Sequence, residues 1–270
     1  MGFATKELLE NATCVFPIEN RALLEIVGRQ RNGIVKDFKS ACPSFEDMNS
    51  IIVNMLLHVT SGSRFPGSLN FDMNELNTNM VPFPKLNFLC AGFNSSLYKS
   101  LKNGKRISKQ VKDEVFLTSC SRINQMVKVD PLGPKSTLMG TTLIGRGSFT
   151  LTDMRGYVEK MQSKGRFTPW SSRAVKIGLC DTPPKGGSLA MLSVHNTSSM
   201  VNLFQHIQRQ FTKLHKKKAH VHHYTKIPGF DADNFAQCSN SLGEIMDSYA
   251  EIENMSPINI PRLKAVKDFS

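Results

Sequence analysis

The spacing of apolar residues changes along the chain, and this change restricts the fold more than any other feature of the sequence. After Ser44, apolar residues recur at the spacing of a helix face, at Met48, Ile51, Ile52, Met55 and Leu56. Val175, Ile177 and Leu179 instead alternate as in a strand. Helical stripes return at residues 204–214 and 235–252. Helical segments on both sides of strand-like runs predict an α/β fold.

Residues at the boundaries of these segments place the individual elements. Ser44 is a good helix cap, and Glu46 and Asp47 favour the first turn that follows it. Pro82 and Pro84 favour extended backbone, which predicts a strand at residues 85–90. Further helices are predicted within residues 1–30, at 70–79 and at 152–163, and further strands at 137–146 and 189–194. Residues 29–43 are predicted to form a loop, and residues 94–135 a polar region with a weak helix.

Composition narrows the class of protein. The 270 residues carry 34 Lys and Arg against 22 Asp and Glu, a net charge of +12, and 40% of them are hydrophobic, as in a globular chain of one large domain or two. No run approaches the ~18 apolar residues of a membrane-spanning helix, and the first residues lack the pattern of a signal peptide. The six cysteines form no Cys-x-x-Cys pair. A cytoplasmic protein with reduced thiols is predicted.

Basic residues gather towards the end of the chain, at Lys213 and Lys216–Lys218, with Arg209 and Lys226 on either side. They indicate either a nucleic-acid-binding surface or a solvated helix face. Nucleic acid is the less favoured partner, because no aromatic residues are interleaved with the lysines. Four histidines share the segment, His215, His220, His222 and His223. No metal site is predicted there, since no cysteine pair is near and the lysine charges oppose a dication.

A phosphate-binding loop is not predicted from the residues themselves. The spacing Gly-x-Gly-x-x-Gly does not occur. In the segment 133–136, Pro134 removes one of the backbone N–H groups that such a loop needs. Composition and spacing alone therefore give a fold class and no function.

Several longer segments resemble tubulin. Residues 64–88 resemble the loop after tubulin's core helix, the short helix that follows and the next strand. Residues 45–49 resemble the start of the core helix. Trp170 and residues 175–184 resemble a strand of the intermediate domain, and residues 211–224 resemble the basic end of the penultimate helix. The landmarks occur in order over nearly the whole chain, apart from residues 29–43 and 100–135.

Within this family the chain is most similar to the epsilon branch. The residues that indicate it are Lys216–Tyr224, Cys14–Asn20 and Ile260–Leu263. The acidic carboxy-terminal tail of alpha- and beta-tubulin is missing. The resemblance begins partway along tubulin, without the half that carries the glycine-rich phosphate loop. A fragment, an incomplete gene prediction or a truncated form is therefore expected.

The resemblance implies an architecture. A remnant of the GTP-binding domain with the core helix is expected at residues 1–62. The tubulin intermediate domain, a mixed sheet with helices in a two-layer sandwich, is expected at 63–196. A helical domain with two long carboxy-terminal helices is expected at 197–270.

Seven residues match functional positions of the family. Asn20 and Asn49 match asparagines that bind the guanine of GTP, and an amide offers both a donor and an acceptor to a base edge. Phe45 matches an aromatic that stacks on the base, a tyrosine in alpha- and beta-tubulin. The residues alone also allow a helix cap for Asn20 and a buried helix start for Phe45.

The other matches lie in residues 67–75. Gly67, Asn70 and Asp72 match a loop that one subunit places over the GTP of the next. Glu75 matches the acid with which alpha-tubulin promotes hydrolysis in trans, where a carboxylate can orient or deprotonate water. A plain exposed helix charge is the alternative for Glu75.

The resemblance implies an epsilon-tubulin-like, cytoskeletal GTP-binding subunit of centrioles and basal bodies, in longitudinal contact with other tubulin subunits. GTP with Mg²⁺ is expected in the full-length form, with GTPase activity at a composite inter-subunit site, and tight binding is not expected of this chain alone. The alternatives are an alpha- or beta-like microtubule lattice subunit and a basic nucleic-acid-binding module that uses Lys213–Lys218. No membrane association is expected.

Overall fold

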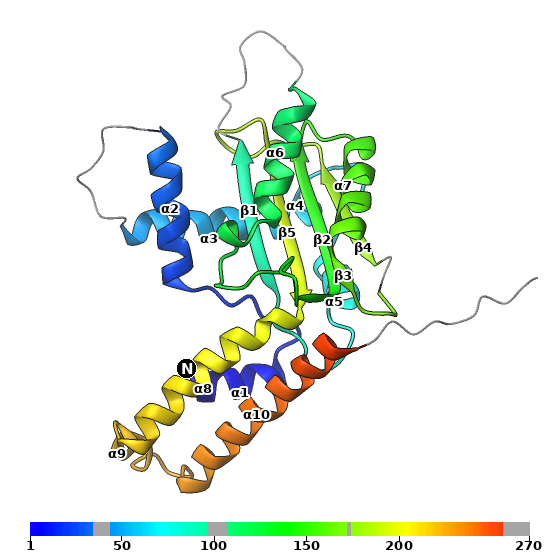
Figure 1. Ribbon diagram of the computed structural model, residues 1–270. Coiled ribbons are helices and arrows are strands. Elements are labelled where there is room, and N and C mark those ends of the chain that lie inside the picture. Colours follow the sequence, from blue (N-terminus) through cyan, green and yellow to red (C-terminus); the bar gives the residue numbers. More distant parts are fainter. Residues whose placement is uncertain (35–43, 97–106, 172–173, 256–270) are drawn as a thin grey trace, which may run out of the picture.

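A computed structural model describes residues 1–34, 44–96, 107–171 and 174–255, and a five-stranded mixed sheet lies at its centre (Figure 1). The strands are β1 (Cys90–Ser96), β2 (Thr137–Gly147), β3 (Arg166–Phe167), β4 (Val175–Cys180) and β5 (Leu189–Thr197). Strand β5 lies between β1 and β2 and is antiparallel to both. Strands β3 and β4 pair in parallel with successive stretches of β2. The α/β class predicted from the sequence is confirmed.

Helices cover both faces of this sheet and extend beyond one end of it. Their bounds are α1 (Gly2–Asn11), α2 (Asn20–Ile34), α3 (Phe45–Val59), α4 (Ser61–Arg64), α5 (Met73–Met80), α6 (Lys109–Cys120), α7 (Leu151–Lys164), α8 (Val201–Lys216), α9 (Val221–Tyr224) and α10 (Ala232–Asn254). Two short 3-10 helices, η1 (Arg122–Asn124) and η2 (Ser198–Met200), connect elements.

Strand β5 contributes side chains to two hydrophobic cores, one on each face of the sheet. Ala190, Leu192 and Val194 pack with α2, α3 and α5, whereas Leu189 and Met191 point to the opposite face and pack with α6 and α7. Every residue of β5 is buried. Because both faces are covered, the strand begins with an unbroken apolar run in the sequence, Leu189–Leu192.

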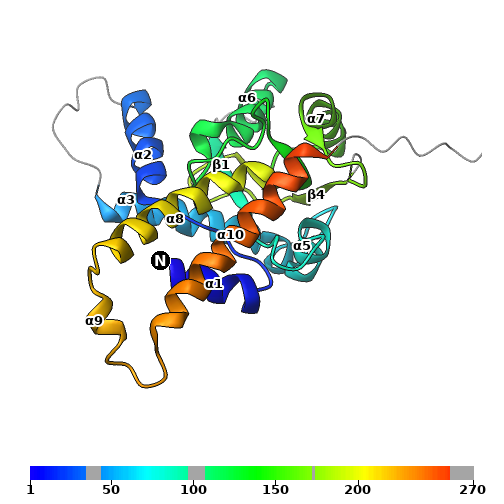
Figure 2. The same cartoon turned by 60° about the horizontal axis from the view of Figure 1, so that its bottom comes forward.

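The terminal helices form a third core. Helices α8 and α10 lie side by side, and α1 packs against both (Figure 2). The helical spacing predicted for α10 places Cys238, Leu242, Ile245, Tyr249 and Ile252 in this core. The ring of Phe204, from α8, stacks on Tyr249 at 5.5 Å between centroids. These contacts attach the two long helices predicted from the sequence to the rest of the chain.

The predicted cap at Ser44 is confirmed, and a second acid caps α10. The Ser44 hydroxyl accepts a hydrogen bond from the Asp47 N–H, and the Asp47 carboxylate accepts one from the Ser44 N–H, which completes a capping box. Asp231 caps α10 in a similar way, through the N–H groups of Asp233 and Asn234.

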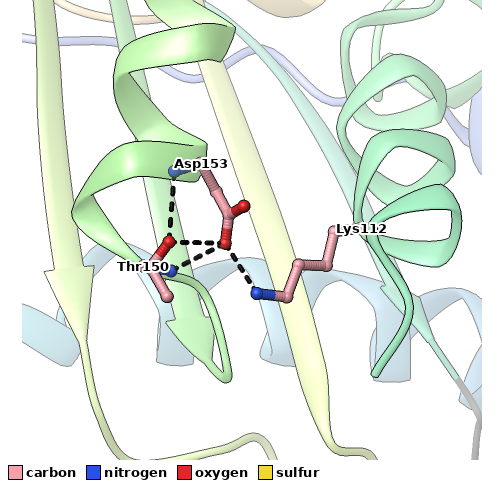
Figure 3. Close-up of polar contacts among 3 residues, drawn as sticks. All are labelled: Lys112, Thr150 and Asp153. Atoms are coloured by element: carbon pink, nitrogen blue, oxygen red, sulfur yellow. Dashed lines mark hydrogen bonds and ion pairs between the residues drawn. The ribbon is translucent and has the colours of Figure 1, made fainter. Parts of the chain in front are cut away.

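A polar contact joins α6 to α7 on one face of the sheet (Figure 3). One carboxylate oxygen of Asp153 accepts hydrogen bonds from the Thr150 N–H (2.9 Å), the Thr150 hydroxyl (2.8 Å) and Lys112 Nζ (2.6 Å). Burial acts to raise the pKa of Asp153, but Lys112 and Thr150 outweigh it, and the pKa is lowered. The carboxylate therefore caps α7 and holds α6 beside it.

Two boundaries differ from the sequence predictions. The strand predicted at 85–90 is wrong, because β1 begins at Cys90, where pairing with β5 starts. Residues 83–86 form a turn instead, with Lys85 at a φ of 70°. Helix α2 continues to Ile34, into the predicted loop, and residues 35–43 of that loop lie outside the described residues.

In the described ranges, none of the helices combines the length and apolar character needed to span a bilayer.

Candidate functional site

The loop before α5 is fastened to strand β4. The Leu179 N–H donates to the Leu69 carbonyl at 3.0 Å, and the Asp181 N–H donates to the Pro66 carbonyl at 3.4 Å. Gly67 lies so close to β4 that a Cβ there would collide with the Leu179 carbonyl oxygen. A glycine at this position therefore allows the loop to lie against the sheet.

Asp72 links this loop to α5. Its Oδ1 accepts a hydrogen bond from the Glu75 N–H at 2.7 Å, which makes Asp72 the cap of the helix. Phe71 before it and Leu76 after it are buried and fix the two sides of the turn. Asn70 is exposed, and its amide makes no hydrogen bond within the described residues. The first turn of α5 therefore has a fixed position on the sheet.

Glu75 lies in that first turn and faces β4. Its Oε2 is 3.0 Å from Nζ of Lys176, the second residue of β4. The Glu75 side chain is 45% exposed and that of Lys176 is 31% exposed. The carboxylate is thus restrained by one cation and is still open to solvent. Lys176 could not be identified from the sequence, because strand alternation places a lysine on a face of the sheet and does not reveal its partner.

The three residues matched to guanine contacts lie in the first turns of two neighbouring helices. Asn20 is the first residue of α2, Phe45 the first of α3, and Asn49 follows Phe45 one helical turn later. The two helices pack through Leu23, Ile26, Val27, Met48 and Ile51. This packing fixes the first turns of the two helices relative to each other.

Both alternative roles considered for these residues are wrong. The carbonyl of Glu19 accepts the first N–H bonds of α2, so Asn20 is inside the helix and is not its cap. Phe45 is 72% exposed, so it is not a buried helix start. The amides of Asn20 and Asn49 are exposed and make no hydrogen bonds among the residues that the structure describes. An exposed ring and two free amides are left for a ligand or a partner.

The histidines of the basic segment do not assemble a metal site in the described part of the chain. The rings of His222 and His223 lie 3.9 Å apart, and His220 lies 6.0 Å from His223. Nowhere among the described residues do three or more His, Cys, Asp or Glu side chains converge as metal ligands. The four histidines are exposed.

Known proteins resemble this chain over most of its length. Residues 84–209 match the model of the tubulin C-terminal domain family. The tubulin epsilon chains of Mus musculus and Homo sapiens are each 32% identical to it over 96% of the chain. The tubulin beta-1 chain of Chondrus crispus is 29% identical over 91% of the chain.

The chain spans 57% and 58% of the mouse and human epsilon chains and 52% of the algal beta chain. The resemblance read from the sequence landmarks is confirmed by these similarities. The chain is thus similar to proteins of the tubulin superfamily over most of its own length.

Proposed function

We propose that this chain belongs to an epsilon-tubulin-like, GTP-binding cytoskeletal subunit. In the assembled protein the loop at residues 67–72 and Glu75 would complete the nucleotide site of a neighbouring subunit. The similarity to epsilon chains supports the cytoskeletal part of the proposal. Because the chain spans little more than half of those relatives, the activity and partners of a whole subunit are part of the proposal.

The arrangement around Glu75 carries the proposal. Asp72 fixes the backbone of Glu75, and Lys176 holds one of its carboxylate oxygens. The other oxygen is left to accept a hydrogen bond or a proton from water, as a general base must. An exposed acid on a helix that had no catalytic role would need neither a capped first turn nor a loop whose position depends on a glycine.

The residues at the starts of α2 and α3 fit the base of GTP. Asn20 and Asn49 have free amides, each with a donor and an acceptor, and Phe45 has an exposed face on which a base can stack. These three residues would hold the guanine. GTP, with its Mg²⁺, supplies the phosphoanhydride bond that is hydrolysed in the composite site.

The contacts of this subunit would be longitudinal ones with other tubulin subunits, in the cytoskeleton and at centrioles or basal bodies. We further propose that residues 1–62 correspond to the end of a GTP-binding domain with the core helix. Residues 63–196 would then be an intermediate domain, and residues 197–270 a helical domain. The core that α8 and α10 share supports a helical unit at the end of the chain, and α1 packs against it from the first segment.

The test measures GTP turnover in a full-length protein co-assembled with tubulin. Glu75→Ala is expected to slow turnover by about 10²-fold or more, the usual contribution of a general base, while co-sedimentation with tubulin is kept. Glu159→Ala, which removes an exposed acid from α7, is the matched control and should turn over normally. Unchanged turnover in assembled Glu75→Ala protein would contradict the proposal.

A further inference from the structure

The far end of the helical pair formed by α8 and α10 is a strongly basic surface. We call residues 211–230 the basic tip; it contains the end of α8, helix α9 and the loop that leads to α10 (Figures 1 and 2). No acidic residue occurs in the sequence between Asp181 and Asp231. The lysines of the tip are Lys213, Lys216, Lys217, Lys218 and Lys226.

These lysines are exposed, and none of them forms an ion pair with a described residue. The acids that follow the tip are Asp231 and Asp233, and Asp231 is already used to cap α10. The positive charge is therefore not neutralised within the described chain. A surface of this kind attracts an anionic partner.

The basic tip is a structured platform. Tyr224 and Phe230, both from the tip, pack on the ring of Phe3 with centroids 5.3 Å and 5.1 Å away. Lys218 and His220 have φ values of 52° and 61°, in the left-handed region that residues other than glycine rarely adopt. The ring contacts hold the backbone of the tip against α1, so the lysines project from a folded segment.

The side chains of the tip favour a polypeptide over a nucleic acid. Single-stranded nucleic acids bind by stacking bases on free aromatic rings, but Tyr224 and Phe230 are engaged with Phe3 and with each other. The tip contains no arginine, the residue best suited to gripping a phosphate with two hydrogen bonds. Leu214 and Ile227 are half exposed among the lysines and can contact apolar side chains of a peptide.

We propose that the basic tip is a docking surface for an acidic polypeptide segment, a stretch rich in Glu or Asp on a partner protein. The lysines would meet its carboxylates as separate point charges, and Leu214 and Ile227 would contact the apolar residues between them. Individual exposed charge pairs are weak, so binding would come from several pairs together and would weaken as salt is added. The proposal does not depend on Glu75 or on GTP.

The test is a fluorescence anisotropy titration of the 270-residue chain into a labelled oligoglutamate peptide, at low and at physiological ionic strength. The triple variant K216Q/K217Q/K218Q is compared with K109Q/K164Q/K185Q, which removes three exposed lysines from other places and changes the net charge equally. Circular dichroism confirms that both variants are folded. We expect the tip variant to bind at least about tenfold more weakly and the control to bind nearly normally.

Three results would overturn the proposal. The first is an absence of oligoglutamate binding at low ionic strength. The second is an equal loss of affinity in the tip and control variants, which would indicate an effect of net charge alone. The third is tighter binding of a single-stranded or duplex oligonucleotide of matched charge through the same three lysines, which would make nucleic acid the partner.

Discussion

At the scale of one residue, the fold fixes the position of a single carboxylate, that of Glu75. Glu75 is restrained twice, through its N–H by Asp72 and through Oε2 by Lys176. The two restraints come from different elements, the helix cap and strand β4. If Glu75 is the general base that we propose, this double restraint would keep it in one geometry, on which its efficiency depends.

Replacing Lys176 by Met should therefore slow GTP turnover without preventing assembly. The substitution keeps the apolar stem and removes the cation that fixes the direction of the Glu75 side chain. We expect a fall of about tenfold in the turnover rate of co-assembled protein, smaller than the fall for Glu75→Ala. Lys176→Arg, which can restore the ion pair, should recover most of the rate. An unaltered rate in Lys176→Met would show that the ion pair does not position Glu75.

Two buried histidines should make the fold sensitive to acid. Burial lowers the pKa of His195, in β5, to about 3, and burial likewise lowers the pKa of His58, in α3, to about 4. An unfolded histidine has a pKa near about 6.5. Below that pH the unfolded chain binds protons that the folded chain does not, so stability falls as the pH drops from about 6.5 towards 4.

Each of the two histidines should contribute a loss of up to about 1.4 kcal/mol per pH unit in this window. Urea unfolding at pH 7.5 and at pH 5 measures the effect. In a His58→Gln/His195→Gln variant the difference between the two pH values should shrink. Equal stability of the unaltered chain at both pH values would contradict the prediction.

At the scale of elements, local chemistry predicted the starts of helices better than the positions of strands. Ser44 caps α3 as expected, because a cap depends only on residues within one turn. The strand expected at 85–90 begins instead at Cys90, because the partner strand β5 decides where pairing starts. Pro82 and Pro84 indicated extended backbone and carried no information about that partner.

The same distinction applies to the candidate site. Glu75, Asp72 and Gly67 belong to one short segment and could be found from its resemblance to tubulin. Lys176 lies about a hundred residues away along the chain and meets Glu75 only through the packing of α5 on the sheet. The exposure of Phe45 could not be predicted either, since an aromatic residue at a helix start is as compatible with burial.

Asp153 offers a test of how capping joins two elements. Asp153→Ala removes the cap of α7 and leaves Lys112, only 11% exposed, without its partner (Figure 3). We expect a loss of about 2–4 kcal/mol in the free energy of unfolding, measured with urea at neutral pH. Asp247→Ala, at an exposed position of α10, is the control and should cost less than about 0.5 kcal/mol. Similar losses in both variants would exclude the linking role of Asp153.

At the scale of the whole molecule, the proposed function assigns separate parts of a nucleotide site to this chain. In that proposal the starts of α2 and α3 would contact a base, and α5 would supply an acid. The described residues contain no glycine-rich loop of consecutive N–H groups that could hold phosphates. If the proposal holds, the residues that contact the base and the acid belong to two different nucleotide sites, and other protein surfaces must complete each of them.

This division predicts how the chain alone responds to nucleotides. GTP should bind weakly, and guanosine about as well, because two amides and one aromatic ring contact the base and nothing built for the triphosphate adds affinity. Isothermal titration calorimetry compares the two ligands, and Phe45→Ala should abolish what binding there is. The variant K216Q/K217Q/K218Q separates this binding from attraction of the triphosphate to the basic tip. Sub-micromolar affinity for GTP, or a large preference for GTP over guanosine that survives in this variant, would mean that the chain holds phosphates itself. A complete nucleotide site would then lie within these 270 residues, and Glu75 would need no neighbouring subunit.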